Sequence, residues 1–279
     1  NIMKLKLFLL VIIFSLKISA QEKHGEEYNY KATYQLDYQE DSTDQNSMKS
    51  ETVVLYLGEG VSRYSSLGKA VEDSLTATLD PSNKSMAEFY RIRSLTPDTD
   101  FHYKIFKNYN DNELILAEKI FKDKLKYKQT LNPVNWEIEQ ETKEVLGYKV
   151  QKASVSFAGR NYEAWFAPEL PFLDGPYKFN GLPGLILEIS DLKDDYHFSL
   201  TEFQEFEKPV TKTSNLDNYK LVSQEELDQF RDDNNRDPIA AMRNAGLKIA
   251  FSKKEHEIET RKMLSEKYER RNNPIELQE

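Results

Sequence analysis

The sequence predicts a mainly β protein, an antiparallel open sheet or partial barrel followed by C-terminal helices. Three observations predict this fold class. Between Tyr28 and Thr211, aromatic and β-branched residues alternate with polar residues at the spacing of half-buried strands. Turn-forming residues separate these short runs. After Thr211 the apolar spacing becomes that of helices, and helix-capping patterns appear.

The first predicted element is a cleaved signal peptide over residues 1–20. Lys4 and Lys6 precede an apolar run from Leu7 to Phe14, and the chain turns polar directly after Ala20. A transmembrane helix needs about 20 apolar residues, so this run is too short. Because the chain has no cysteine, cleavage leaves none for lipid attachment. We therefore expect a soluble periplasmic or secreted protein without a lipid anchor or a membrane span.

Residues 21–211 are predicted to form one antiparallel β domain. A helical turn or two is expected over residues 70–79, and a long shaped loop is expected from Pro168 to Gly184. The clearest hairpin joins Tyr148–Phe157 to Tyr162–Ala167. Alternating apolar residues predict further strands around residues 34–38, 53–57, 103–105, 114–116 and 125–127.

Residues 212–279 are predicted to form a helical C-terminal region, packed on the β domain or extending from it. Ser223–Glu226 has the capping-box pattern of a helix start. Asp237–Pro238 places an N-cap before a proline at the first helical position, and Gly246 stands where a C-terminal cap is expected. The charged stretch 252–271 predicts a third, largely solvated helix.

Composition excludes several classes of function. The formal net charge is −9, and loss of the three lysines in the signal peptide would make the chain more negative. Nucleic acids and anionic lipid surfaces are therefore not expected as partners, because phosphate binding needs clustered Lys and Arg. The absence of cysteine excludes thiol catalysis and thiolate zinc sites. Cationic, neutral and protein ligands remain open.

The glycine-rich stretch GPYKFNGLPGLILEI, residues 175–189, invites comparison with known binding loops. A phosphate-binding loop opens a helix, whereas these glycines precede a strand-forming run. The stretch contains no serine, so it is not a nucleophile elbow. Instead, Leu182–Leu185 matches a type II turn with Pro183 at its second position and Gly184 at its third. We interpret Gly181, Pro183 and Gly184 as a structural turn that directs a strand.

No catalytic, cofactor-binding or metal-binding residues can be assigned from the sequence. The four histidines are scattered, and no pair has metal-ligand spacing. The chain has 47 acidic residues, too many to single out a catalytic carboxylate pair without geometry.

Aromatic residues suggest one candidate surface near the shaped loop. Most of the 16 Tyr and 15 Phe are expected in the core. Arg160, Trp165, Tyr177 and Phe179 are the candidates for an exposed patch that binds a protein partner, because Tyr, Trp and Arg are favoured at such centres.

A series of motifs lies between Trp136 and Ile189: Trp136-x-Ile138, Glu144–Lys149, Lys152-Ala153, Phe157-x-Gly159-Arg160-x-Tyr162-x-Ala164-Trp165-Phe166, Pro168–Pro171, Gly175–Phe179 and the hexapeptide Gly181–Ile186. In this order they resemble the GLPGLI family of secreted Bacteroidetes proteins, which is named for that hexapeptide. The Asn-Pro-Ile-Glu-Leu ending at 273–277 agrees loosely. This chain has Val150 where many members have cysteine. The resemblance implies a periplasmic, mostly β protein, often encoded beside TonB-dependent outer-membrane receptors, and it implies no catalytic residue.

The leading hypothesis is a non-catalytic periplasmic binding or accessory protein that serves an outer-membrane receptor or another envelope protein. The alternative is a hydrolase of envelope peptides or glycans that uses carboxylates. A cleft that gathers two perturbed acidic groups would favour the enzyme, and an apolar groove without them would favour binding. A third hypothesis, metal handling, requires His and carboxylate side chains to converge.

Overall fold

The computed structural model describes residues 26–79, 85–131, 134–212 and 215–277 of the chain. The predicted signal peptide lies outside these residues. Within them, twelve strands form one open sheet with β12 and β7 at its two edges. The mainly β prediction and its open sheet are confirmed.

All neighbouring strands pair antiparallel except β12, which lies parallel to β6. The spatial order is β12-β6-β5-β4-β3-β2-β1-β11-β10-β9-β8-β7. The strands are β1 Glu26–Gln39, β2 Met48–Leu57, β3 Val61–Ser66, β4 Lys104–Asn108, β5 Glu113–Ile120, β6 Asp123–Thr130, β7 Glu137–Val145, β8 Tyr148–Phe157, β9 Arg160–Ala167, β10 Leu185–Asp191, β11 Tyr196–Lys212 and β12 Lys220–Leu221.

The helices fall into two groups. Two of them interrupt the strands between β3 and β4, and the others follow β12 near the C-terminus. They are α1 Leu67–Ala77, α2 Met86–Leu95, α3 Gln224–Arg236, α4 Pro238–Asn244 and α5 Lys254–Glu269, with a short 3-10 helix η1 at Leu216–Asn218. No helix in the described residues is long and apolar enough to cross a membrane.

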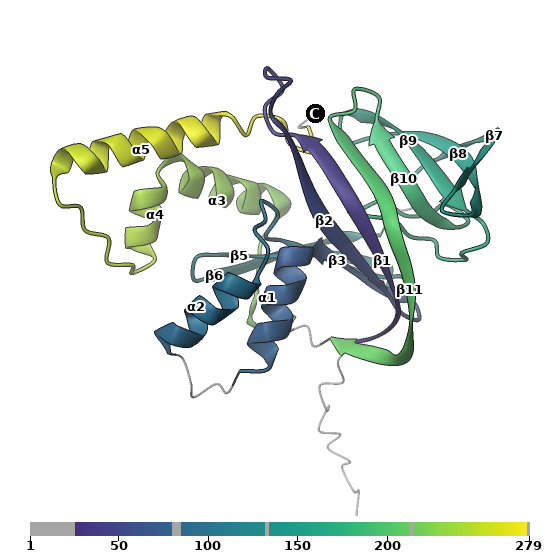
Figure 1. Cartoon of the computed structure of the whole chain (residues 1–279), viewed down its shortest axis with the longest axis horizontal. Coiled ribbons are helices and arrows are strands. Elements are labelled where there is room, and N and C mark those ends of the chain that lie inside the picture. Colours follow the sequence, from purple (N-terminus) through teal and green to yellow (C-terminus); the bar gives the residue numbers. More distant parts are fainter. Residues whose placement is uncertain (1–25, 80–84, 132–133, 213–214, 278–279) are drawn as a thin grey trace, which may run out of the picture.

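The sheet is strongly twisted, so its two ends point in different directions (Figure 1). The long strands β1, β2 and β11 form its centre, and β7 to β10 form one end. At the other end, β5 and β6 run almost across the direction of β1 in this view (Figure 1). Helix α3 packs on β6, and α1 packs beside β2 and β3. Accumulated strand twist explains this change of direction across so many strands.

The core lies on one face of the sheet and is shared by both ends. Alternate residues of β1, including Tyr34, Leu36 and Tyr38, are buried in it, as their spacing predicts. The loop between β9 and β10 adds Tyr177 and Phe179 to the same apolar cluster. Because this loop fills the core, it is part of the protein interior rather than a surface connection.

The predicted helix starts are confirmed. Ser223 and Glu226 form the reciprocal hydrogen bonds of a capping box at α3. Asp237 caps α4 by accepting a hydrogen bond from the backbone N–H of Ala240, and Pro238 is the first helical residue. Gly246 follows α4 with a φ of 85°, which glycine adopts readily.

Strand β3 and helix α2 are among the elements that the sequence did not predict. Strand β3 was not predicted, because its buried residues include Ser62 and Ser65, which do not read as apolar. Helix α2 was not predicted either, because its apolar residues surround the helix instead of following one stripe.

Candidate functional site

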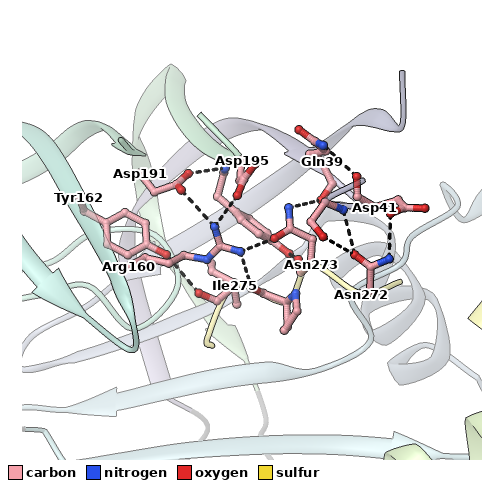
Figure 2. Close-up of polar contacts among 12 residues, drawn as sticks. Gln39, Asp41, Arg160, Tyr162, Asp191, Asp195, Asn272, Asn273 and Ile275 are labelled. Atoms are coloured by element: carbon pink, nitrogen blue, oxygen red, sulfur yellow. Dashed lines mark hydrogen bonds and ion pairs between the residues drawn. The ribbon is translucent and has the colours of Figure 1, made fainter. Parts of the chain in front are cut away.

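The most connected polar site is built around Arg160, the first residue of β9. A two-residue turn at Ala158 and Gly159 joins β8 to β9, and both residues have positive φ, as tight hairpin turns require. The Arg160 side chain is only 4% exposed, and its Nη1 donates to Asp195 at 2.8 Å and Asp191 at 3.0 Å (Figure 2). One buried guanidinium is therefore paired with two carboxylates.

The other side of the guanidinium binds the C-terminal segment. Arg160 Nη2 donates to the side-chain oxygen of Asn273 at 2.6 Å and to the carbonyl oxygen of Pro274 at 2.8 Å. The amide of Asn273 in turn donates to the Gln39 carbonyl at 2.9 Å, as Figure 2 shows. Asn273 is buried, so this segment is anchored inside the protein.

Tyrosine hydroxyls hold the backbone of the same segment. Tyr196 donates to the Asn273 carbonyl at 2.7 Å, and Tyr162 donates to the Ile275 carbonyl at 3.2 Å. The N–H of Leu277 donates to the Ala158 carbonyl at 3.0 Å. We call the protein groups that bind residues 272–277 the tail clamp, and the segment itself the tail.

A second charged group of the clamp binds Glu276. Tyr177 donates a hydrogen bond of 2.7 Å to this carboxylate, and Lys178 forms an ion pair with it. The Lys178 side chain is 4% exposed, and burial lowers its pKa although Glu276 opposes the shift. The clamp is therefore rich in donors and is matched to the carbonyls and the carboxylate of the tail.

The proposed partner surface is not formed as expected. Arg160, Tyr177 and Phe179 are buried, so they cannot present an exposed patch. Trp165 is half-buried and lies apart from them, with the Lys143 ammonium over its ring at 4.4 Å. The physical reason is that the tail and the core cover these side chains, which the local sequence does not reveal.

The Gly181–Gly184 segment directs β10 as expected, but its turn is not of type II. Gly184 N donates to the Leu182 carbonyl, which closes a three-residue turn centred on Pro183. Leu185 N donates to the Leu170 carbonyl instead of closing the four-residue turn. The carbonyl of Leu170, and not that of Leu182, therefore accepts the hydrogen bond from Leu185 that a type II turn would have formed.

A groove of about 1380 Å³ lies beside α2. It is bounded by α1, α2, part of β2, residues 96–102 and the C-terminal end of α5. Its apolar wall includes Met86, Phe89 and Ile92. None of the α2 residues is buried, and Met86 and Phe89 are 63% and 60% exposed.

The polar wall of the groove centres on Asp100. Burial raises the pKa of Asp100, but hydrogen bonds from Lys49 and Tyr38 and the charge of Arg271 outweigh burial and bring it to about 2. Lys49 and Tyr38 donate to it at 2.9 and 2.8 Å. Neighbouring Glu51 has its pKa raised by burial, although it accepts hydrogen bonds from Asp100 N and Thr99.

Every carboxylate that lines the groove has a donor partner. Besides Glu51 and Asp100, the lining carboxylates are Glu72, Glu88 and Asp98. They form ion pairs with Lys69, Arg91 and Arg93, respectively. By contrast, the lining lysines Lys119 and Lys267 form no ion pair with any residue in the described ranges. The groove therefore offers an apolar wall and two ammonium groups that no carboxylate of the described residues pairs with.

Among the residues that the structure describes, no three His, Asp or Glu side chains converge as metal ligands. Neither the tail clamp nor the groove could be predicted from the sequence. The only sequence signal for the clamp was the Asn-Pro-Ile-Glu-Leu ending.

Residues 157–188 match the Porph_ging family model, which is described as a protein of unknown function. This short stretch includes Arg160, Tyr162, Tyr177 and Lys178 of the clamp. No curated protein matches the chain.

Among solved structures, the chain is similar to PNGF-II. The structure in space group P21 has a TM-score of 0.51 and 15% identity, and the match covers 72% of this chain and 32% of PNGF-II. The structure in space group C2 gives a TM-score of 0.49 and 14% identity over the same shares. This chain thus spans about a third of PNGF-II. At this identity, the likeness to the P21 structure shows a similar fold and nothing about activity.

Proposed function

We propose that this protein is an exported member of the GLPGLI family and a non-catalytic binding or accessory protein of the cell envelope. Its partner is an outer-membrane receptor or another envelope protein. The intact hexapeptide at Gly181–Ile186 and the signal-like pattern of residues 1–20 support the family and the location.

The groove beside α2 is the observation that carries the binding role. An apolar wall next to lysines that have no ion-pair partner among the described residues suits a segment with apolar side chains and an acidic group. Every carboxylate that lines the groove accepts a hydrogen bond or forms an ion pair. Carboxylates with such partners suit a structural role better than catalysis. The partner segment therefore lies along α2 with its acidic group toward Lys119 and Lys267.

Co-purification from solubilised envelope of the source organism tests this function. The double variant Met86→Ser, Phe89→Ser changes the groove wall, whereas Tyr90→Ser, Leu95→Ser changes exposed apolar residues of α2 outside the groove lining. We expect the wild type and the control variant to retain one receptor or assembly protein, identified by mass spectrometry, and the groove variant to lose it. Equal recovery by both variants would contradict the groove as the binding site.

One observation favours the alternative, an envelope hydrolase. Glu51 and Asp100 are adjacent carboxylates in the groove beside α2, and their pKa values are shifted in opposite directions. Such divergence is typical of acid and base pairs. Turnover of envelope peptides or glycans that disappears in Glu51→Gln, with binding retained, would replace the binding function with this one.

A further inference from the structure

A serine, a histidine and an aspartate lie in hydrogen-bonding order where β11 begins. The side chains of Tyr196 and Phe198 belong to the core, so the alternating His197 and Ser199 lie on the opposite, outer face of the sheet. Ser199 Oγ is 3.1 Å from His197 Nε2, and His197 Nδ1 is 3.3 Å from Asp194 Oδ1. One ring nitrogen therefore faces a hydroxyl, and the other faces a carboxylate.

The carboxylate fixes which nitrogen of the ring carries the proton. An ionised aspartate can only accept a hydrogen bond, so Nδ1 of a neutral His197 donates to Asp194. Nε2 then keeps its lone pair and accepts the hydrogen bond from the Ser199 hydroxyl. A hydroxyl held by a base that a carboxylate orients is the arrangement of Ser-His-Asp hydrolases, which is recognised by geometry and not by fold.

The turn that carries Asp194 is anchored to the protein interior. Asp194 has a φ of 58°, and its N–H donates to the Asp191 carbonyl at 2.9 Å. The carboxylates of Asp191 and Asp195, before and after it in the sequence, are both bound by the buried Arg160 guanidinium. The side chains of His197 and Asp194 are nevertheless 37% and 72% exposed. The three groups are therefore held by a strand and a fixed turn, and they are open to a substrate.

The neighbouring strands supply further groups that ester hydrolysis needs. In the register of the sheet, Ser199 lies opposite Gln35 on β1 and opposite Glu188 on β10. Gln35 Nε2 donates a long hydrogen bond of 3.3 Å to Asp37, so this amide can turn toward an oxyanion that forms at Ser199. Beyond Glu188 the register continues to Trp165 on β9, whose half-buried ring offers an apolar surface.

We propose that Ser199 and His197 hydrolyse carboxylic esters with a small acyl group on the outer face of the sheet. Ser199 Oγ bonds to the carbonyl carbon while its proton passes to His197 Nε2, and the carbonyl electron pair moves onto the oxygen beside Gln35. The pair returns as the ester C–O bond breaks, and the leaving alcohol takes the proton from Nε2. The acyl group is small because a long chain on this exposed face would remain in water.

Water completes the reaction at the same groups. It attacks the carbon of the acyl group on Ser199 while one of its protons passes to His197 Nε2. The bond between this carbon and Ser199 Oγ then breaks, and Oγ takes the proton back from Nε2 as the acid leaves. One ester and one water thus give one acid and one alcohol, and the protein returns to its starting state.

This activity is separate from the binding role proposed for the groove. Neither His197 nor Ser199 lines the groove. The inference therefore adds a catalytic site to a protein whose groove binds without catalysis, and either function can be present without the other.

Covalent labelling tests the nucleophile. The purified protein is treated with a fluorophosphonate, which phosphonylates an activated serine, and peptide mass spectrometry identifies the modified residue. We expect one adduct, at Ser199, in the wild type and in the control Ser190→Ala, because Ser190 lies opposite His197 on the same outer face. The variant His197→Gln should lose the adduct although it keeps Ser199. An unmodified Ser199 in the wild type, or equal modification in His197→Gln, would overturn the proposal.

Hydrolysis of 4-nitrophenyl acetate tests turnover. We expect Ser199→Ala to lower kcat/KM about 100-fold or more, the lower end of what a positioned base contributes. Asp194→Asn should also lower it, because the tautomer of His197 is no longer fixed, whereas Ser190→Ala should not. An exposed imidazole can hydrolyse this ester alone. A folded Ser199→Ala variant that is as fast as the wild type would therefore rule out the serine nucleophile.

Discussion

At the scale of single residues, Gly184 shows how tightly two backbones are packed at the start of β10. A Cβ atom built on this residue would lie 2.2 Å from the carbonyl oxygen of Ala167 and 2.9 Å from Pro168 N. Both are backbone atoms of the β9 end, so they cannot move aside as a flexible side chain would. The glycine is required by this close approach.

We predict that Gly184→Ala lowers the free energy of unfolding by about 2 kcal/mol or more, because the added methyl overlaps the backbone of β9. Gly147 is a suitable control, since it has a φ of 82° but, apart from its chain neighbours, no described atom lies within 4 Å of its ideal Cβ position. Gly147→Ala should cost only about 1 kcal/mol through its backbone conformation. Urea denaturation measures both, and equal losses would contradict the packing argument.

At the scale of elements, Asp100 joins the segment after α2 to the β1–β2 hairpin and to the end of α5. It accepts hydrogen bonds from Tyr38 and Lys49 and forms an ion pair with Arg271. These contacts require the ionised carboxylate. They also make one wall of the groove depend on the position of the chain that leads into the tail.

The pKa of Asp100 predicts how this connection responds to acid. Its pKa falls from the ordinary 3.8 to about 2 in the folded protein, where hydrogen bonds and charges outweigh burial. The folded state thus keeps the carboxylate ionised where the unfolded chain binds a proton. The stabilisation is therefore present above the unfolded pKa and is lost as the pH falls through the folded pKa.

We therefore expect the difference in unfolding free energy between wild type and Asp100→Asn to be largest above about pH 5 and to shrink toward about pH 2. Asp98, whose side chain is 90% exposed, provides the control. Asp98→Asn should change stability little at any of these pH values, because exposed pairs contribute little. A pH-independent difference for Asp100→Asn would contradict the assigned linkage.

At the scale of the whole molecule, a buried ion pair joins the two ends of the sheet through the core. Lys107 on β4 donates to Asp174 at 2.5 Å and to the carbonyls of Gly175 and Phe179 at 2.9 and 3.0 Å. The side chains of Lys107 and Asp174 are 1% and 2% exposed. Burial lowers the pKa of Lys107 while Asp174 opposes that shift. The loop before β10 is thus attached to the opposite end of the sheet.

We predict that Asp174→Asn costs about 3–5 kcal/mol, because it leaves the Lys107 charge buried without a partner. The double variant Lys107→Met, Asp174→Asn carries no uncompensated charge and should lose less. Chemical denaturation of the three proteins gives both differences. A single variant as stable as the wild type would show that the pair does not hold the two ends together.

The sequence alone determined the mainly β class, the helix starts at Ser223 and Asp237 and the direction of the chain at Gly184. These features depend on spacing and on local hydrogen bonds, as in the alternation of Tyr34 and Leu36 or the capping box at Ser223. Such interactions involve residues close in the sequence, so they can be read without a structure.

Only the tertiary structure decided the site. Arg160 and Asn273 are 113 positions apart, and Lys107 and Asp174 are 67 apart. The sequence predicted Arg160 and Tyr177 as exposed residues of a partner surface. No residue close to them in the sequence indicates that the tail covers both. The turn at Pro183 is not the predicted type II turn. The N–H of Leu185 donates its hydrogen bond to the carbonyl of Leu170, on another segment, instead of to the carbonyl of Leu182. Contacts across such separations depend on how a twelve-stranded sheet twists, and local patterns do not encode that geometry.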